Sequence, residues 1–347
     1  MPSLQPSYLT GLRFDTSELS TIRRIGEARG RQDLFVRQFP EQLDTLRTNA
    51  IVESTESSNR IEGVVAAPGR VADLVVRRAE PRTRSEQEIA GYRDALQLIH
   101  ESHADMQLAQ NIVLQLHHML YRYQPGTGGR WKSADNQIVE READGTVVRV
   151  RFNPTPAVAT PQAMADLSTH YHDAVAGSLA DPLVLLPLAV LDFLCVHPFT
   201  DGNGRVGRLL SLLLLYHFDY QVGRYVSLER LIEESRETYY EALALSSRAW
   251  HEHTHDAHPW LNYFWGVLIR AYGEFEARVE SLQGSKTQQV RAAVARRLGP
   301  FGIADLEHDC PGVSRDMVRH VLRQMRVEGR VKVEGRGRGA KWRAGSF

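Results

Sequence analysis

Two strongly apolar runs, separated by a short polar and glycine-rich stretch, constrain this chain more than any other feature. The runs cover residues 182–196 and 209–216, and residues 197–208 between them read His-Pro-Phe-Thr-Asp-Gly-Asn-Gly-Arg-Val-Gly-Arg. This pattern predicts two buried helices joined by a loop. Glycines adopt backbone conformations that other residues avoid, so successive N–H groups of the loop can converge on one anion. The second helix is expected to begin near Asn203, where its N-terminal N–H groups favour a phosphate.

The polar stretch matches the signature of a known enzyme family at every specified position. It resembles the Fic signature, His-x-Phe-x-Asp/Glu-Gly-Asn-Gly-Arg-x-x-Arg, from His197 to Arg208. The resemblance implies transfer of AMP from ATP, with Mg²⁺, onto a Ser, Thr or Tyr hydroxyl of a target protein. The family also contains a kinase branch with an altered turn and members that move other phosphate-containing groups. The intact Gly-Asn-Gly turn favours nucleotide transfer without fixing which nucleotide is used.

The residue types of the signature suit this chemistry. His197, with an ordinary pKa near ~6.5, is the expected catalytic base that takes the hydroxyl proton. Asp201 is an oxygen ligand suited to Mg²⁺. Phosphate ligands are expected from the backbone of the turn, from an Asn amide and from two arginines on one helical face. These ligands are Gly202, Asn203, Gly204, Arg205 and Arg208.

A second motif, Ser-Asn-Arg-Ile-Glu-Gly, lies upstream at residues 58–63. It resembles the motif Ser/Thr-x-x-x-Glu-Gly/Asn of Fic proteins that carry their own inhibitor, which makes Ser58, Glu62 and Gly63 the inhibitory residues. Residues 40–60 have a helix-compatible composition and Gly63 suits a C-terminal cap, so Glu62 is expected to end a helix. The resemblance implies that Glu62 pairs with Arg208 and denies the γ-phosphate its partner. A capped helix without a regulatory role is the alternative.

Two other segments resemble further parts of the family. The β-rich residues 137–141 and 146–152 flank Asp144-Gly145 and predict a hairpin. Its free edge resembles the flap that holds a target's extended segment by main-chain pairing, although a purely structural hairpin is the alternative. Tyr239 and Tyr240 resemble the aromatic residues that flank the adenine. Two tyrosines on a helix are more often part of a core.

Residues 251–255 match a competing pattern, the His-Glu-x-x-His of zinc peptidases, in which two histidines lie one helical turn apart. The match falls within a His-rich patch that is closed by Pro259. The patch is typical of a connection between two helices rather than of a helix interior. We therefore expect no catalytic zinc at this position.

The amino-acid composition limits the classes of protein to which this chain can belong. A chain of 347 residues with 42% hydrophobic residues can bury the cores of two or three domains. The two cysteines, Cys195 and Cys310, lie in different regions and suggest no disulfide framework, which fits a reducing compartment. Neither a signal peptide nor a run long enough to cross a bilayer is recognised. We expect a cytoplasmic protein that does not associate with membranes.

Charge is unevenly spread along the chain, although the net charge is zero. Residues 281–347 carry fourteen Lys and Arg against six Asp and Glu, a net charge of +8. Expected helices at 286–298, 303–308 and 314–327, followed by a basic hairpin, resemble a winged helix-turn-helix. Its expected DNA contacts are Arg315, Arg319, Arg323, Arg336 and Arg338. Winged helices also dock proteins and form dimers, so a protein partner or a homodimer stays open.

These segments together predict an all-α fold, with a Fic helical core and a β-hairpin flap, followed by a small winged helix-turn-helix domain. The expected domains are 1–110, a helical region whose inhibitory helix ends near Gly63, then 111–283, the Fic core, and 284–347, the winged helix. Two alternatives to AMP transfer stay open. One is removal of AMP from a modified target, with Glu62 orienting water, and the other is a nucleotide-sensing DNA-binding regulator. The intact His197 favours an enzyme, since a sensor needs no base.

Overall fold

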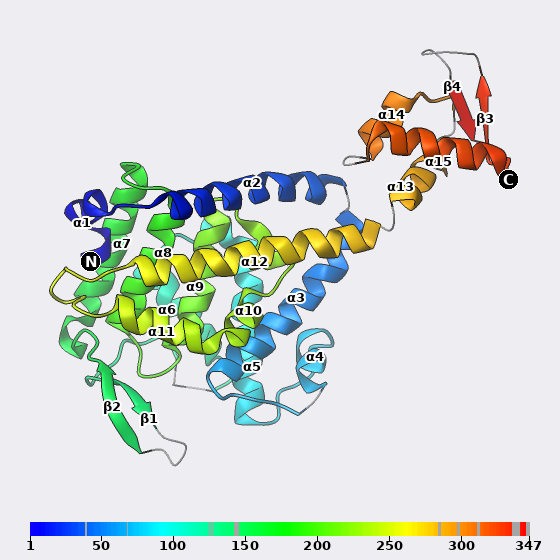
Figure 1. Ribbon diagram of the computed structural model, residues 1–347. Helices are drawn as coiled ribbons and strands as arrows, with labels where there is room; N and C mark the ends of the chain where they lie inside the picture. Colours follow the sequence, from blue (N-terminus) through cyan, green and yellow to red (C-terminus); the bar gives the residue numbers. More distant parts are fainter. Residues whose placement is uncertain are drawn as a thin grey trace. The chain divides into compact units, whose positions relative to one another are not determined.

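Helices form most of the chain in the computed structural model (Figure 1), so the prediction of a mainly helical fold is confirmed. The structure describes residues 1–38, 40–67, 69–124, 126, 128–141, 146–283, 286–295, 297, 299–310, 313–334 and 341–344. The chain divides into two compact units, Met1–Phe275 and Glu276–Phe347. The first unit holds both the predicted N-terminal region and most of the predicted core, and the three-domain division stays a prediction.

The first unit consists of helices and one antiparallel hairpin. Its helices are α1 Pro6–Gly11, α2 Thr16–Gln38, α3 Pro40–Ile61, α4 Arg70–Val75, α5 Arg84–Ser102, α6 Gln110–Leu120, α7 Thr160–Ala176, α8 Pro182–Val196, α9 Asn203–His217, α10 Leu228–Glu234, α11 Arg236–Ser246 and α12 His258–Gln283, which continues past the end of the unit. Short 3-10 helices lie at Pro2–Leu4, His103–Asp105, Ala157–Ala159 and Gln221–Arg224.

Helices α8 and α9 pack against each other in the core of this unit, as the two apolar runs predict. Helix α8 begins after Asp181, whose side chain accepts a hydrogen bond from the Leu183 N–H, and every residue from position 183 to 196 is buried. Helix α9 begins at Asn203 as expected, because Gly202 at its N-cap adopts a left-handed conformation with φ of 84°. The polar loop is therefore fixed between two buried helices.

The predicted hairpin is present, as strands β1 Ile138–Arg141 and β2 Val147–Phe152. Figure 1 shows it extending from the helical body of the first unit. The side chains of Val147, Val148 and Val150 on β2 remain 43–54% exposed. The predicted tip at Asp144-Gly145 lies outside the described residues. An exposed strand with apolar side chains is available for pairing with another extended segment.

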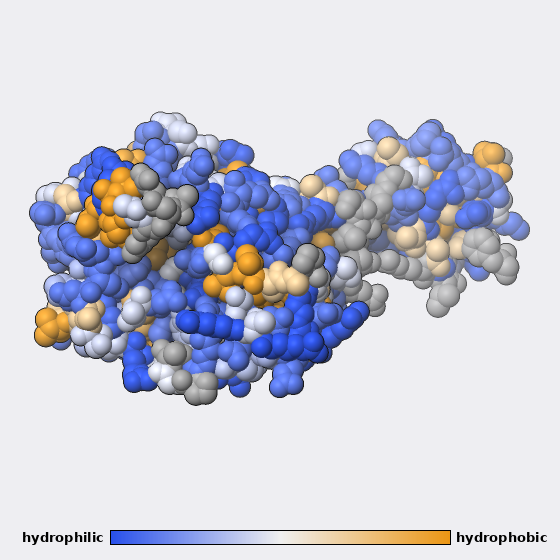
Figure 2. All heavy atoms as spheres, turned by 90° about the horizontal axis from the view of Figure 1, so that it is seen from below, coloured by the Kyte–Doolittle hydropathy of each residue, from blue (hydrophilic) through white to orange (hydrophobic). Residues whose placement is uncertain are grey.

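The surface is mostly hydrophilic on the face shown in Figure 2, where the apolar residues form separate small patches. Within the part of the chain that the structure describes, no helix combines the length and apolar character needed to cross a membrane.

After the end of α12, the described residues of the second unit form three helices and a hairpin in the predicted order. They are α13 Lys286–Ala295, α14 Ile303–Asp309, α15 Arg315–Val327, β3 Val331–Glu334 and β4 Lys341–Ala344. Aliphatic side chains of all three helices form its core. Phe301 joins the hairpin through two backbone hydrogen bonds with Trp342. Helix α13 is described to Ala295, and residues 296 and 298 of the predicted helix 286–298 lie outside the described residues, as do residues 284–285 before it.

Candidate active site

A cavity of about 660 Å³ lies beside the loop between α8 and α9. Its walls come from the end of α3, the flap strands, the loop and α11, which are far apart in the sequence. Its volume falls in the range of small-molecule sites, about 300–1,000 Å³. The lining residues that carry the chemistry are Glu62, Arg151, His197, Thr200, Asp201, Gly204, Arg208, Tyr239 and Tyr240. The fold thus brings together most of the residues singled out in residues 1–275.

His197 follows α8 in a left-handed conformation, with φ of 49° and ψ of 60°. Its Nδ1 lies 3.3 Å from the carbonyl oxygen of Leu194. A carbonyl only accepts, so Nδ1 carries the proton in this bond and Nε2 keeps its lone pair. Burial lowers the pKa of His197 from 6.5 to about 4. The imidazole is therefore neutral at physiological pH and can act as a base.

Asn203 clamps the loop. Its Oδ1 accepts a hydrogen bond of 2.9 Å from the Phe199 N–H, and its Nδ2 donates one of 2.8 Å to the Phe199 carbonyl. The Phe199 ring stacks on His117, with 3.7 Å between ring centroids. This geometry differs from the expected contact between the Asn203 amide and a phosphate, because both amide atoms already bond to the backbone. The backbone N–H groups of the turn remain as candidate anion ligands.

Asp201 presents a carboxylate beside the cavity, with its side chain 68% exposed. Tyr121 donates a 2.7 Å hydrogen bond to Oδ2, and the Gly202 N–H donates one of 2.7 Å to Oδ1. Burial raises the pKa of Asp201, but these bonds and the charge of Arg205 outweigh it and hold the pKa below its usual value. The described residues contain no group of three or more His, Cys, Asp and Glu that could hold a metal ion. Asp201 thus fits Mg²⁺ only as one ligand, with phosphate oxygens and water supplying the others.

Arg205 lies away from the cavity, in contrast to the expectation that it contacts phosphate. Its side chain is 1% exposed, and Nη1 donates a 2.6 Å hydrogen bond to Glu88 on α5. Nη2 donates to the Tyr121 hydroxyl at 2.9 Å. Arg205 and Arg208 are three positions apart on α9, but the carboxylate of Glu88 holds Arg205 inside the protein. Arg205 therefore fixes the loop through Tyr121 and Asp201.

Arg208 points to the cavity and pairs with Glu62, as the resemblance implies. Nη2 donates at 2.8 Å to Glu62 Oε1, while Nε and Nη2 donate at 2.8 Å to Ser58 Oγ and to the Ser58 carbonyl. The arginine side chain is 3% exposed and that of the glutamate 30%. Burial lowers the pKa of Arg208, but Glu62, Tyr239 and Tyr92 together outweigh this effect, so the pKa lies above its usual value. Gly63, with φ of 78°, ends α3 and turns the chain away.

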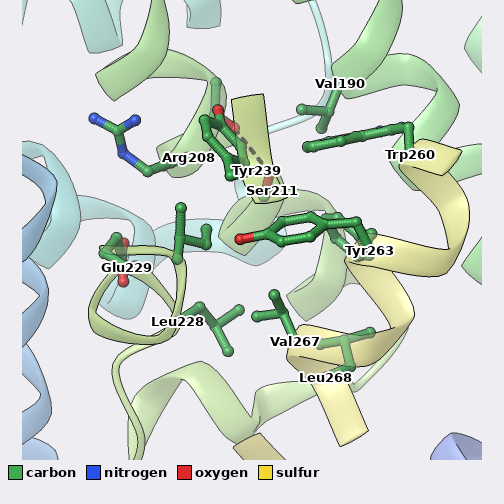
Figure 3. Close-up of a pocket in the computed structure, with 13 residues that line it drawn as sticks. Val190, Arg208, Ser211, Leu228, Glu229, Tyr239, Trp260, Tyr263, Val267 and Leu268 are labelled. Carbon is green, nitrogen blue, oxygen red and sulfur yellow. Dashed lines mark hydrogen bonds between the residues drawn. The ribbon is translucent and has the colours of Figure 1, made fainter. Parts of the chain in front are cut away.

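The two tyrosines of α11 differ in position. Tyr239 is 3% exposed and packs at 5.8 Å from Trp260 and 5.7 Å from Tyr263, between ring centroids. It also borders a second, enclosed cavity of about 20 Å³ behind Arg208 (Figure 3). Tyr240 is only partly buried and lines the large cavity, with the Arg236 guanidinium 5.6 Å from its ring centroid. Tyr240 is therefore the better placed of the two to contact a base.

Sequence reasoning missed several residues that organise this site. Glu88, His117 and Tyr121 hold the loop, and Arg151 of the flap lines the cavity. His117 lies in the last turn of α6 and Tyr121 directly follows that helix, four positions later, and this spacing was a usable signal. Nothing local marked Glu88, whose partner Arg205 is 117 positions away.

The His-Glu-x-x-His pattern at 251–255 lies between α11 and α12, as the connecting-segment interpretation predicts. His251 stacks on Phe152 with parallel rings, and its Nε2 lies 2.8 Å from the Asn153 carbonyl oxygen. His255 is buried 2.9 Å from Ser3 Oγ. These histidines join the end of the flap and the N-terminal segment to the helical body.

The predicted DNA-contacting residues lie in the second unit. Arg315, Arg319 and Arg323 are exposed along α15, at spacings of four that place them on one face. Arg315 pairs with Glu307 and Arg319 with Asp316, both at the surface. Arg336 and Arg338 lie outside the described residues.

Residues 107–215 match the Fic/DOC family model, over α6 to α9 and including the loop and the flap. The chain contains a Fic/DOC family domain. Proteins with a Fic domain are usually transferases that move AMP or other nucleotide-derived groups onto proteins, and they typically bind ATP with Mg²⁺.

Solved structures share the fold. A Fic family protein from Desulfovibrio desulfuricans G20 is 23% identical, with 97% of this chain and 98% of that chain covered and a TM-score of 0.64. A Fic domain containing signaling protein from Bacteroides thetaiotaomicron is 20% identical, with 75% and 97% covered and a TM-score of 0.61. For Fic-1 from C. elegans the identity is 19%, the coverage 77% and 73%, and the TM-score 0.59. At these identities the similarity shows a common fold.

Proposed function

We propose that this Fic-domain protein transfers AMP from ATP onto a hydroxyl side chain of a target protein, and that Glu62 inhibits the transfer. One observation carries the proposal: the Glu62 carboxylate rests against Gly204 and Arg208, beside a neutral His197. An internal anion occupies the place where a helix N-terminus and an arginine favour a phosphate. The carboxylate thus stands in for the γ-phosphate.

Each of these residues of the cavity has its own role in the proposed reaction. His197 Nε2 takes the proton of the target hydroxyl, whose oxygen then attacks the α-phosphorus of ATP. The bond from the α-phosphorus to the oxygen bridging to the β-phosphate breaks, and pyrophosphate leaves. Mg²⁺, held by Asp201, would neutralise charge on the phosphates. Arg208 would bind the γ-phosphate, and Tyr240 would contact the adenine.

The exposed edge of the flap supports a protein as the acceptor. Val147, Val148 and Val150 of β2 are exposed, and among the described residues β2 pairs with no strand except β1. A target segment that pairs with this edge would place its hydroxyl beside His197, because residues of both flap strands line the same cavity.

Inhibition follows because Glu62 and the γ-phosphate of ATP compete for the Arg208 guanidinium. While Glu62 bonds to Arg208, ATP lacks a partner for its γ-phosphate, and its α-phosphate is misplaced for in-line attack. A misplacement of about 1 Å can cost roughly 10² in rate. The reverse reaction is the alternative, because the Glu62 carboxylate borders the same cavity as His197 and could orient a water molecule towards AMP on a modified target.

Intact mass spectrometry after incubation with ATP and Mg²⁺ tests this proposal. The Glu62→Gly protein, or a lysate partner, should gain AMP, while the wild type should gain little. Glu56→Gly is the matched control, because Glu56 lies on α3 and pairs with Arg60 at the surface. Equal modification of wild type and Glu62→Gly would show that residues 58–63 form the end of a helix and do not inhibit transfer. Loss of AMP already carried by a target would identify the reverse reaction.

The second unit supports a second proposal, that it contacts DNA through α15. The observation in favour is the row of exposed arginines at 315, 319 and 323 on a domain of net positive charge. Under this proposal the Fic domain senses nucleotide and the second unit carries the response to DNA. A protein-docking role is the competing outcome of the salt-dependent binding experiment described in the Discussion.

A further inference from the structure

We propose that Lys132 is a positioning residue for His197, because it bonds to the backbone on both sides of the base from the segment that leads into the flap. The inference rests on the proposed function, in which His197 takes the proton of the target hydroxyl. Lys132 does not line the cavity, so it acts through the loop and not on a substrate. The reaction described above leaves this buried lysine without a role.

Lys132 is a buried cation that donates to two neutral oxygen atoms. The residue is 4% exposed, and its Nζ donates at 2.8 Å to Asn136 Oδ1 and at 3.2 Å to the Val196 carbonyl oxygen. Among the described residues, no carboxylate lies within ion-pair distance of Nζ. Burial lowers the pKa of Lys132 to about 8, against the opposing effect of Asp135, so Nζ keeps its charge near pH 7. Val196 ends α8, and the C-terminal end of a helix dipole favours a cation.

The side chain of Lys132 fixes the peptide group that precedes His197. The oxygen of this group belongs to Val196, whose carbonyl has no partner within α8, and it accepts the bond from Nζ. The N–H of the same group belongs to His197 and donates at 2.9 Å to the Phe193 carbonyl. Because a peptide group is planar, bonds at both of its polar atoms fix its orientation.

The backbone of Lys132 fixes the peptide group that follows Pro198 in the same way. The Pro198 oxygen accepts a 2.8 Å hydrogen bond from the Lys132 N–H, and the Phe199 N–H donates to Asn203 Oδ1. Between the two fixed groups the proline ring sets its own φ, which leaves His197 little freedom. A left-handed conformation is unfavourable for a histidine and persists only where the surroundings hold it. Lys132 thus keeps His197 in the conformation that leaves the Nε2 lone pair for the target hydroxyl.

The phosphate-binding turn has anchors that do not involve Lys132. Asn203 clamps it to the backbone of Phe199, and the Tyr121 hydroxyl bonds to the Asp201 carboxylate. His117 Nε2 lies 3.1 Å from the Asp201 carbonyl oxygen. Loss of the Lys132 ammonium should therefore displace the base and spare the turn at 202–204 that receives ATP.

Label incorporation from α-labelled ATP and calorimetry of ATP binding test this role, both in the Glu62→Gly protein. Lys132→Met removes the ammonium and keeps a side chain of similar length. Incorporation should fall about tenfold or more, since a misplacement of about 1 Å can cost roughly 10² in rate. The Kd for ATP with Mg²⁺ should not change. Lys332→Met is the matched control, because Lys332 is exposed on β3, and it should change neither measurement.

NMR of the His197 ring nitrogens, assigned by comparison with His197→Ala, measures the placement of the base directly. In the parent protein Nδ1 should be protonated and Nε2 should not. Lys132→Met should lose this single tautomer, because the contact of Nδ1 with the Leu194 carbonyl depends on the backbone that Lys132 holds. If Lys132→Met does not fold, Asn136→Leu decides. It removes the acceptor that orients Nζ and should change the same measurements to a smaller extent.

The outcomes separate positioning from general damage. An unchanged His197 tautomer in a folded Lys132→Met protein overturns the inference, and so does an equal loss of incorporation and ATP affinity. A Glu62→Gly protein that incorporates no AMP overturns the proposed function instead. The NMR measurement then still decides whether Lys132 positions His197, because it requires no transfer.

Discussion

Glu62 and Gly204 are in such close contact that a β-carbon at Gly204 would overlap Glu62 Oε1 and lie 3.2 Å from Arg208 Nη1. Gly204 stands in the first turn of α9, where the N–H groups have no partner within the helix. The absence of a side chain lets the carboxylate rest on the backbone of the turn. The same absence would admit a phosphate once the carboxylate leaves.

Gly204→Ala should destabilise the protein through this contact. Overpacking a tight site costs about 1–3 kcal/mol in the free energy of unfolding. The cost should fall when Glu62→Gly is also present, because the nearest overlapping atom is then removed. Urea denaturation of the four proteins of this cycle measures the coupling. A cost of Gly204→Ala that does not depend on Glu62 would show that the carboxylate does not rest on the turn in solution.

His197→Ala should abolish transfer while sparing ATP binding, because the base acts on the hydroxyl and not on the phosphates. Loss of a general base costs about 10²–10⁴ in rate. The measurement is label incorporation from α-labelled ATP in the Glu62→Gly background, with calorimetry of ATP binding beside it. Undiminished incorporation would remove His197 from the mechanism.

The low pKa of His197 fixes the direction of the pH dependence. The folded protein keeps the imidazole neutral down to a pH of about 4, whereas the unfolded chain takes up this proton near 6.5. The rate of transfer by the Glu62→Gly protein should therefore not fall near pH 6.5, because His197 remains neutral there. The same shift makes stability fall as pH drops from 6.5 towards about 4, because the unfolded state binds more protons there. The pH profile of kcat/KM measures the first effect, and an inflection near 6.5 would contradict it.

Asn203→Ala should destabilise the loop. The substitution leaves the buried Phe199 N–H without its partner, at a cost of about 1–3 kcal/mol in the free energy of unfolding. The Phe199 carbonyl keeps a 3.0 Å hydrogen bond from Asn136. Gln162→Ala, on the exposed surface of α7, is the control and should change the midpoint of thermal unfolding little. Similar midpoints for both variants would contradict the clamp.

Substituting Arg315, Arg319 and Arg323 together with Ala should abolish salt-sensitive DNA binding by the full chain. Contacts to phosphate release counterions, so the affinity of the parent protein should fall steeply as salt rises. Fluorescence anisotropy with a labelled duplex measures this. The control replaces three exposed arginines of the first unit, Arg13, Arg23 and Arg248. If the parent protein does not bind at low salt, the second unit is better explained as a protein-docking module.

The elements of this protein were largely readable from local sequence. The apolar runs gave α8 and α9, the glycines gave the turn between them, and Gly63 gave the end of α3, because each depends on neighbours within one or two turns. The order of helices and hairpin in the second unit followed from the same local signals. The signature also located the catalytic candidate His197 and the cation Arg208 before any contact was known.

Only the tertiary structure decided what each polar side chain does. Arg205 and Arg208 stand in the same motif, but Glu88 on α5 holds Arg205 in the interior, whereas Glu62, directly after α3, pairs with Arg208 at the cavity. Asn203 bonds to the loop rather than facing a ligand. These outcomes depend on which distant carboxylate or carbonyl packs within hydrogen-bond reach. A sequence motif specifies residue types and their spacing along the chain. Which of these residues come within hydrogen-bond distance of each other depends on how helices from distant parts of the sequence pack together.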